Sequence, residues 1–520
     1  MISCAALERP GKWRVVGLAT GLLLALGPSL ALLVTLEDTT EASSSTVFTT
    51  AFAEALLRSL SVGAVVALLS VAVGLPTGVV AGLYDFPRRR LLLALIALPL
   101  LVPSFIGAIG LSMLRIGLGL PGRDLLSGFS GTVLAFTSFG VPLTLFITLA
   151  SVRGLSRGQV EAARLAGGER HLVGCVARGV FPAAALTSIL AGVLTLSDPG
   201  PGQILGYAGA ASEILVSFAS QYDFTLAARQ CAVLAGVVFV LGLPVALLLA
   251  PGLAWGLLAR DVTPAPLAHM TRMKLLGPMW LLALLLFILV MPLVGFTQPL
   301  LGSFPIERAM QEVERTIGNT VCYAVAASLM ATALGMALAV CAGRDGKLRV
   351  TLLVGLLLLF ALPPSVAALG WIRLAGGSPA QLDPILRGPF TVSLALALRF
   401  FPVAAVFAMR SLGTTSSSWA NAAAIHGISL PTYARRVLAP WMAGATLPAA
   451  LLIAFLATAD VSTVLLLHPP GEGSLPLAIF TVMANAPESL VGALCVVYVG
   501  GAAVLLAIGW VMMISIQRRT

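Results

Sequence analysis

The segment SRGQVEAARLAG, residues 156–167, has a counterpart 260 residues further along the chain, SSSWANAAAIHG at residues 416–427. Each copy begins with serine, has a pair of alanines at its centre and ends with glycine, and each lies between long apolar runs. A membrane protein that repeats one amphipathic loop in this way is expected to offer two equivalent docking sites to a partner.

The composition predicts a polytopic membrane protein. Apolar residues make up 58% of the chain and charged residues only 10%, whereas an ordinary soluble domain has about 25% charged residues. Every backbone polar group must be hydrogen-bonded inside lipid, so the spans are expected to be helices. Runs of roughly 18 or more apolar residues give twelve expected spans: 15–36, 59–83, 91–114, 131–151, 183–198, 227–250, 275–296, 319–342, 350–372, 390–409, 441–460 and 489–514.

The basic residues gather in alternate connecting segments. If the N-terminus is cytosolic, 22 of the 31 basic residues fall in cytosolic segments, as the positive-inside rule requires. Both termini are then cytosolic, and the net charge of +10 reflects topology and not nucleic-acid binding. The run at 15–36 is interpreted as an uncleaved first helix, because no small-x-small cleavage site follows it.

Residue identities recur at a nearly constant offset over about 160 residues. Pro103-Ser104 matches Pro364-Ser365 at an offset of 261, and Asp198 matches Asp460 at 262. Other matches are Gly74 with Gly335, Ala81-Gly82 with Ala342-Gly343, Ser212 with Ser474 and Phe218 with Phe480. These matches predict two homologous halves of six helices each, 1–274 and 275–520, related by a pseudo-two-fold axis along the membrane normal.

Each repeated loop is expected to contain one short helix. Ser156 followed by Gln159 is a capping box, and Gly167 is a stop signal, which together define a helix of about ten residues. Ser416 and Gly427 bracket an equivalent helix. Both glycines are expected to adopt a left-handed conformation that ends the helix.

The first loop carries a specific motif. Glu161-Ala162-Ala163 is followed by Gly167 and by an apolar-x-Pro ending at Pro182. This pattern resembles the EAA loop in permeases of binding-protein-dependent ABC importers. In that family the loop is a coupling helix that sits in a cleft of the cytosolic ATPase.

The second loop repeats the motif with one change. It has Asn421-Ala422-Ala423, Gly427 and Pro440, so asparagine stands where the family has glutamate. The first loop keeps the glutamate, but its Gly-to-Pro stretch is two residues longer than the family's. Pro182 and Pro440 are both expected in the first turn of the membrane helix that follows.

A single chain with both permease halves resembles the fused permeases of the ferric-iron and thiamine import systems, as does the segment LLLHPPG at 465–471. The resemblance implies an all-α type I importer permease of about twelve transmembrane helices in the bacterial inner membrane. It also implies two ABC ATPase subunits and a periplasmic solute-binding protein as partners. It does not identify the solute, because permeases for polyamines, phosphonates and sulfate share this plan.

Catalytic chemistry is not expected on this chain. Neither Lys12 nor Lys347, which follow glycines, has the Ser/Thr and upstream glycine of a phosphate-binding loop. ATP hydrolysis is therefore expected on a separate subunit. The four histidines and six cysteines are too scattered for a metal site or a disulfide framework, and no cofactor is expected.

Asp198 and Asp460 stand at matching positions near the outer ends of the fifth and eleventh spans. Acidic groups inside a membrane protein are expected to line a translocation path or to pair with a cation such as Arg229 or Arg399. The alternative is structural: Asp198 would form a turn with the proline that follows it, and Asp460 would cap a helix.

A secondary transporter of the major facilitator type is the alternative function, because it also has six plus six spans in parallel repeats. The short loops GLYDFPRRR at 82–90 and GRDGK at 343–347 superficially resemble that family's loop motif. However, the longest internal cytosolic loops follow spans four and ten, whereas that family places its long loop between the halves. The ABC permease is therefore favoured.

Overall fold

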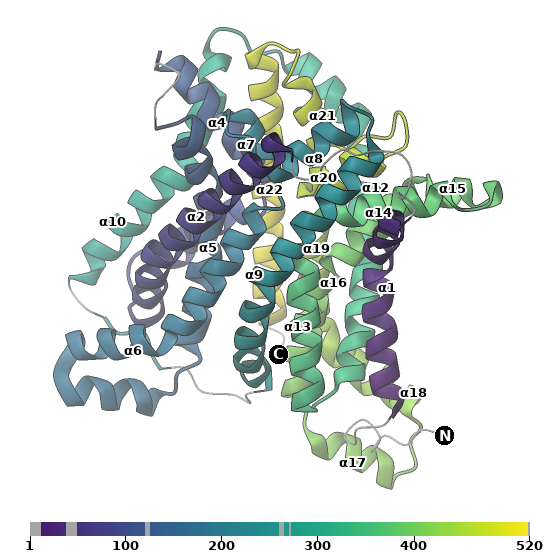
Figure 1. Ribbon diagram of the computed structural model, residues 1–520. Coiled ribbons are helices and arrows are strands. Elements are labelled where there is room, and N and C mark those ends of the chain that lie inside the picture. Colours follow the sequence, from purple (N-terminus) through teal and green to yellow (C-terminus); the bar gives the residue numbers. More distant parts are fainter. Residues whose placement is uncertain (1–11, 38–48, 120–124, 259–264, 270–271, 518–520) are drawn as a thin grey trace.

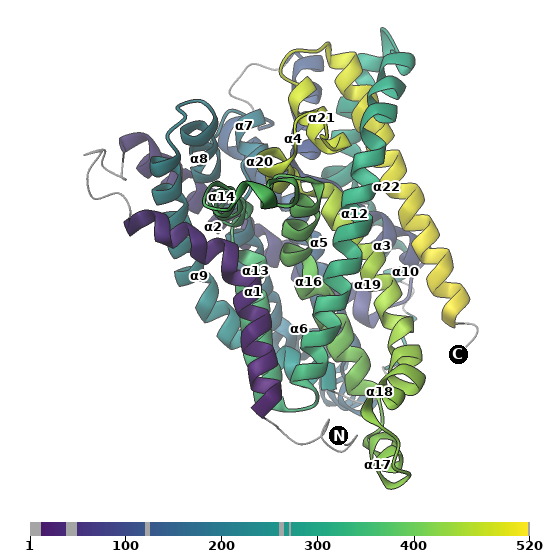
Figure 2. The same ribbon diagram turned by 90° about the vertical axis from the view of Figure 1, so that its right-hand side faces the viewer.

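The computed structural model describes residues 12–37, 49–119, 125–258, 265–269 and 272–517. Within these residues the secondary structure is helical, apart from one isolated bridge between Tyr84 and Ala268 (Figures 1 and 2). The helices before residue 300 are α1 (Lys12–Glu37), α2 (Thr50–Leu83), α3 (Arg89–Ala97), α4 (Ser104–Gly117), α5 (Gly128–Arg153), α6 (Arg157–Thr195), α7 (Gly200–Ile204), α8 (Ala210–Ala219), α9 (Phe224–Leu258), α10 (Met273–Leu285) and α11 (Met291–Thr297).

The remaining helices are α12 (Ile306–Ala342), α13 (Gly346–Ala361), α14 (Pro364–Gly376), α15 (Asp383–Leu386), α16 (Pro389–Thr414), α17 (Ser417–Ile425), α18 (Leu430–Tyr433), α19 (Ala439–Ala459), α20 (Val461–Leu467), α21 (Leu475–Val482) and α22 (Glu488–Gln517). Short 3-10 or π turns extend several of them. The fold is all-α, as the apolar runs predict.

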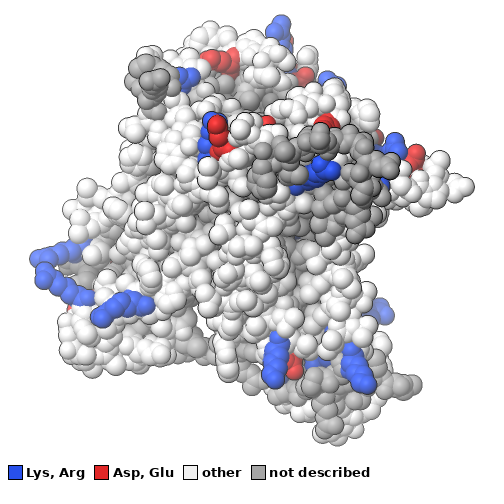
Figure 3. Space-filling model, in the orientation of Figure 1, with Lys and Arg blue, Asp and Glu red and all other residues white. Residues whose placement is uncertain are grey.

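Ten of the described helical segments are long and apolar enough to cross a membrane, or up to twelve if each of two bent helix pairs is one span. Large apolar side chains such as Leu57, Val240 and Val511 are more than half exposed along these helices, where lipid would cover them. Figure 3 shows a largely uncharged middle band, with Lys and Arg toward the two ends of the molecule. The protein is a multi-pass helical membrane protein.

Two of the expected spans, 91–114 and 350–372, are not continuous helices. The pair formed by α3 and α4 is bent by 96°, and the pair formed by α13 and α14 by 85°. Pro103 and Pro363 stand at the two bends with extended ψ values of 136° and 133°. The prediction of unbroken helices is wrong here because proline lacks the backbone N–H that would continue the helical ladder.

The long helices pack in two groups of three: α2, α5 and α6, and then α12, α16 and α19. Small residues allow close contact within each group. A Cβ added to Gly74 of α2 would lie 2.9 Å from the Cβ of Thr144 in α5, and one added to Gly335 of α12 would lie 2.6 Å from the Cβ of Ala404 in α16.

The helix that precedes each group packs on the other half of the chain. Helix α1 lies against α12 and α14, and α11 lies against α4. Helices α7, α8, α20 and α21 lie toward the end of the molecule away from α17 (Figure 1). The two repeated loops lie at the α17 end, which we call the loop end.

Candidate functional sites

The first repeated loop forms the beginning of α6. The Ser156 hydroxyl accepts a hydrogen bond from the Gln159 backbone N–H (3.3 Å), and the Gln159 side chain accepts one from the Ser156 backbone N–H (2.9 Å). The expected capping box is confirmed. The helical conformation breaks at Gly167 and Gly168 and then resumes, so the short helix ends where the sequence predicts.

The left-handed residue of this loop is Gly168 and not Gly167. Gly167 has an extended φ of −167°, whereas Gly168 has φ 71° and ψ −166°, a conformation that is essentially reserved for glycine. Pro182 lies inside α6, not in its first turn. That expectation is wrong because the glycine pair already turns the chain, and the membrane helix restarts directly after it.

The second repeated loop forms α17. Ser416 is its N-cap and accepts a hydrogen bond from the Ser418 backbone N–H (3.3 Å). Gly427 follows with a left-handed φ of 66°, as predicted. Trp419 of α17 packs edge to face against Trp441 of α19, with ring centroids 5.2 Å apart, which holds the helix against the membrane-spanning part. Pro440 follows the π turn at Ala434–Leu438 within one candidate span, Pro431–Ala459. It therefore does not lie in the first turn of its membrane helix, and that expectation is wrong because the span already begins at Pro431.

The predicted docking residues do not all face outward. Ala162, Asn421 and Ala422 are exposed, and the exposed Glu161 carboxylate pairs with Arg157 on its own helix at 2.6 Å. In contrast, Ala423 is buried. Ala163 is partly buried against an apolar cluster of this same chain that includes Val160, Leu172 and Val176. The second alanine of each motif therefore attaches the loop helix to the rest of the protein.

Each loop helix has one large apolar side chain that is more than four-fifths exposed and that sequence reasoning missed. Leu165 is 88% exposed and Ile425 is 83% exposed. Both stand four residues after the first residue of the motif, Glu161 or Asn421. The shared apolar residue at this spacing was the signal that could have identified them.

A polar cluster supports the first loop after its glycine break. The Tyr84 hydroxyl donates to Glu169 at 2.9 Å, and Arg164 pairs with the same carboxylate at 2.6 Å. Burial and this hydrogen bond raise the pKa of Tyr84 to about 12. Tyr84 therefore remains protonated at neutral pH and continues to donate, which links the end of α2 to the restart of α6.

The role of the two loop glycines with positive φ, Gly168 and Gly427, can be tested by replacing each of them with alanine. Gly168→Ala and Gly427→Ala place a side chain where φ is positive, at a cost of about 1–2 kcal/mol each, and should increase proteolytic cleavage of the loops. Gly158→Ala is the matched control because Gly158 lies in the first turn of α6 with open space at its Cβ. Gly158→Ala should leave cleavage unchanged or reduced. Equal cleavage of all three variants would contradict the role of these glycines.

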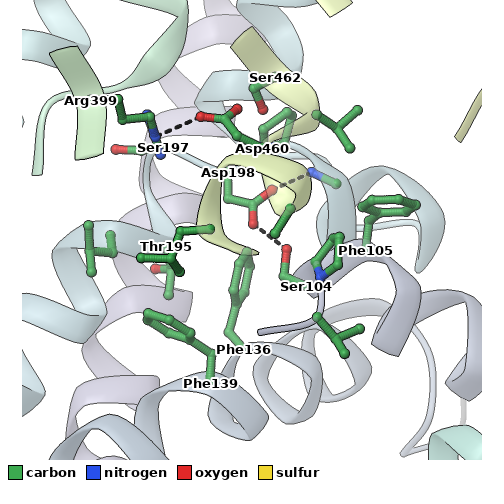
Figure 4. Close-up of a pocket in the computed structure, with 18 of the residues that line it drawn as sticks. Ser104, Phe105, Phe136, Phe139, Thr195, Ser197, Asp198, Arg399, Asp460 and Ser462 are labelled. Carbon is green, nitrogen blue, oxygen red and sulfur yellow. Dashed lines mark hydrogen bonds and ion pairs between the residues drawn. The ribbon is translucent and has the colours of Figure 1, made fainter. Parts of the chain in front are cut away.

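A second candidate site is a cavity of about 180 Å³ at the other end of the long helices (Figure 4). The ends of α6 and α19 and the broken α3–α4 pair meet here. The polar lining residues include Ser104, Thr195, Ser197, Asp198, Arg399, Asp460 and Ser462. Six phenylalanines complete much of the wall: Phe105, Phe136, Phe139, Phe360, Phe400 and Phe480.

Asp198 lines this cavity and makes two hydrogen bonds. It accepts one from the Ser104 hydroxyl and one from the Gly200 backbone N–H at 2.9 Å. The second bond closes the turn that the sequence indicates. Among the described residues no cation lies within ion-pair distance of Asp198, so its expected pairing with Arg229 or Arg399 does not occur.

Asp460 lines the same cavity and combines two predicted roles. Its carboxylate caps α20 by accepting from the Thr463 backbone N–H at 2.9 Å and from the Thr463 hydroxyl at 3.0 Å. It also pairs with Arg399 at 2.8 Å. The Arg399 guanidinium lies 5.6 Å from the centre of the Phe400 ring.

The structure thus separates the predicted residues into two sets. The two motifs lie at the loop end on separate helices, while Asp198 and Asp460 share one cavity toward the opposite end (Figures 1 and 4). Sequence reasoning missed the phenylalanines around the two acids, although Phe139 and Phe400 stand at the repeat offset of 261.

No protein-family model matches the chain, and a search of curated proteins finds no match. The fold and the two sites define the class as an all-α, multi-pass membrane protein with ten to twelve candidate spans.

Proposed function

We propose that the chain is the membrane-spanning permease of an ABC importer, with both transmembrane domains in one polypeptide. The supporting observation is the pair of loop helices. They stand 260 residues apart, begin at a serine cap and end at a glycine turn. Each presents one apolar side chain that is more than four-fifths exposed, Leu165 or Ile425.

Equivalent contacts in the two halves of the chain support an internal duplication. The Ser59 hydroxyl accepts a hydrogen bond from the Ala210 backbone N–H at 2.9 Å, just where α8 begins. Thr320, 261 residues later, accepts one from the Leu475 backbone N–H at 2.8 Å, where α21 begins. The two bent helix pairs, α3–α4 and α13–α14, occur at an offset of 260, measured between the starts of α4 and α14.

In the proposed mechanism, a periplasmic binding protein delivers a solute to the end of the molecule opposite the loops. Two cytosolic ATPase subunits dock beneath the loop helices and close on ATP. Each loop helix is joined by a glycine turn to the helix that reaches the cavity: the part of α6 after Gly168 runs toward Asp198, and α19 runs toward Asp460. Movement of the ATPases would therefore reach both acidic residues through these two helices.

The test is ATP hydrolysis by the intact complex. The chain purified from its native membrane in mild detergent should retain an ATPase whose activity vanadate inhibits. The chain separated from that subunit should hydrolyse no ATP, because it has no phosphate-binding loop. A chain that catalyses uptake in proteoliposomes from a proton gradient alone, with no ATPase present, would contradict the proposal and favour a secondary transporter.

A further inference from the structure

We infer that the cavity around Asp198 binds a small organic cation. The binding itself follows from the cavity, while its role in import rests on the permease function proposed above. Four properties of the lining support this inference: its charge, its aromatic rings, its size and its free hydroxyl group.

One of the two carboxylates in the cavity, that of Asp198, makes no ion pair with a residue that the structure describes. Among the residues that the structure describes, Arg399 is the only Lys or Arg in the lining, and it already pairs with Asp460 at 2.8 Å. Asp198 is hydrogen-bonded, yet no described cation pairs with it, and part of its surface is exposed. A monocation bound beside Asp198 would stabilise its ionised form, whereas an anion would oppose ionisation and a neutral solute would not favour it.

Aromatic rings share the cavity with this carboxylate. Figure 4 shows Phe105 to one side of Asp198, and Phe136 and Phe139 below it. Ring faces attract cations that carry little bound water, quaternary ammonium groups above all. Arg399 over the Phe400 ring already shows this interaction inside the same cavity. A carboxylate among phenylalanines therefore favours an alkylammonium group over a strongly hydrated inorganic ion.

The side chains that line the cavity favour an organic cation over a metal ion. Within the described residues no group of three or more His, Cys, Asp or Glu side chains could hold a metal. Of the two carboxylates in the cavity, Asp460 is engaged by Arg399 and by Thr463. The other polar side chains of the lining include the neutral hydroxyls of Ser104, Thr195, Ser197 and Ser462, whereas a hard cation such as Ca²⁺ prefers six to eight oxygens with several carboxylates among them.

Size and hydrogen bonding narrow the ligand further. An engineered cavity of about 150 Å³ binds benzene, so the 180 Å³ here suits a solute of that size or slightly larger. The Ser462 hydroxyl, on the cavity wall, makes no hydrogen bond to any residue that the structure describes, and it is free to bind a polar group of the ligand. Choline, with a quaternary ammonium and one hydroxyl, is a suitable probe.

The test measures equilibrium binding of radiolabelled choline to the full chain in lipid nanodiscs. Its neutral competitor is 3,3-dimethylbutan-1-ol, which has the same shape with carbon in place of nitrogen. We expect saturable choline binding, at least tenfold weaker competition by the neutral isostere, and at least a tenfold loss of affinity in Asp198→Asn. Phe139→Leu should weaken binding severalfold without altering charge.

Asp223→Asn is the matched control. Asp223 also accepts a hydrogen bond from a backbone N–H, that of Leu226 at 2.8 Å, but it lies outside the cavity. This variant should bind choline like the unmodified chain, and all variants should elute as the same monodisperse peak in size-exclusion chromatography.

Absence of choline binding would overturn the inference. Equal competition by the neutral isostere would do so too, as would unchanged affinity in Asp198→Asn or binding of methylphosphonate that depends on Arg399. The experiment also distinguishes a failure of this inference from a failure of the permease proposal. A chain that binds choline but no ATPase contradicts only the permease proposal, whereas one that binds an ATPase but not choline contradicts only this inference.

Discussion

Replacing both exposed apolar residues of the loop helices, Leu165→Ser together with Ile425→Ser, is expected to weaken binding of the ATPase at least about a hundredfold. Burying one such side chain contributes about 1.5–3 kcal/mol, so the pair contributes about 3–6 kcal/mol, and about 1.4 kcal/mol corresponds to a factor of ten. Folding should not suffer, because both side chains are more than four-fifths exposed in the chain alone. The measurement is the Kd of the separated chain for its ATPase, by biolayer interferometry.

The chain provides a matched control for this experiment. Leu301 is 89% exposed and belongs to the outer end in the proposed topology. Leu301→Ser should therefore leave ATPase binding unchanged. A double loop variant that binds the ATPase as tightly as the Leu301 variant would show that these helices are not the docking elements, and the permease proposal would lose its main support.

Glu161 and Asn421 should contribute less to docking than the apolar pair. Glu161 already pairs with Arg157 on a solvent-exposed helix face, and exposed pairs contribute about 0–1 kcal/mol. A basic group of the ATPase would compete for the same carboxylate, whereas Asn421 offers no charge. The two docking sites are therefore expected to be unequal, with the first more sensitive to salt.

The membrane class could be predicted from the sequence because it depends on composition and on run length, which tertiary packing does not alter. The capping box at Ser156 and the glycine stop at Gly427 could be predicted for a similar reason, since each is a local interaction within a few residues. The sequence does not distinguish Gly167 from Gly168 as the residue with positive φ, because two adjacent glycines satisfy the same local pattern and only the path of the following helix separates them.

The bends and the cavity could not be predicted in the same way. An apolar run looks the same whether or not a proline such as Pro103 divides it into two helices, because proline is tolerated inside many membrane helices. The sequence offers a helix cap and an ion pair as alternatives for Asp460, but one carboxylate has enough lone pairs for both. The phenylalanine wall depends on contacts between helices far apart in sequence, on which helical periodicity carries no information.

The ion pair between Arg399 and Asp460 is expected to have the largest effect on stability of any single pair in the cavity. The Asp460 side chain is only 4% exposed and that of Arg399 is 23% exposed. Removing one partner of a buried pair leaves an uncompensated charge and costs about 3–5 kcal/mol. Arg399→Met should therefore lower the thermal unfolding temperature of the detergent-solubilised protein markedly, as followed by intrinsic tryptophan fluorescence.

Two further variants separate the charge effect from simple loss of packing. Adding Asp460→Asn to Arg399→Met should recover most of the lost stability, because asparagine keeps an oxygen to cap α20 without leaving a buried charge. Arg58→Met removes an arginine whose pair with Glu54 is exposed on both sides, and it should cost no more than about 1 kcal/mol. If the double variant is as unstable as Arg399→Met alone, the arginine stabilises the protein through packing against Phe400 and the surrounding helices, and Asp460 does not depend on it for charge compensation.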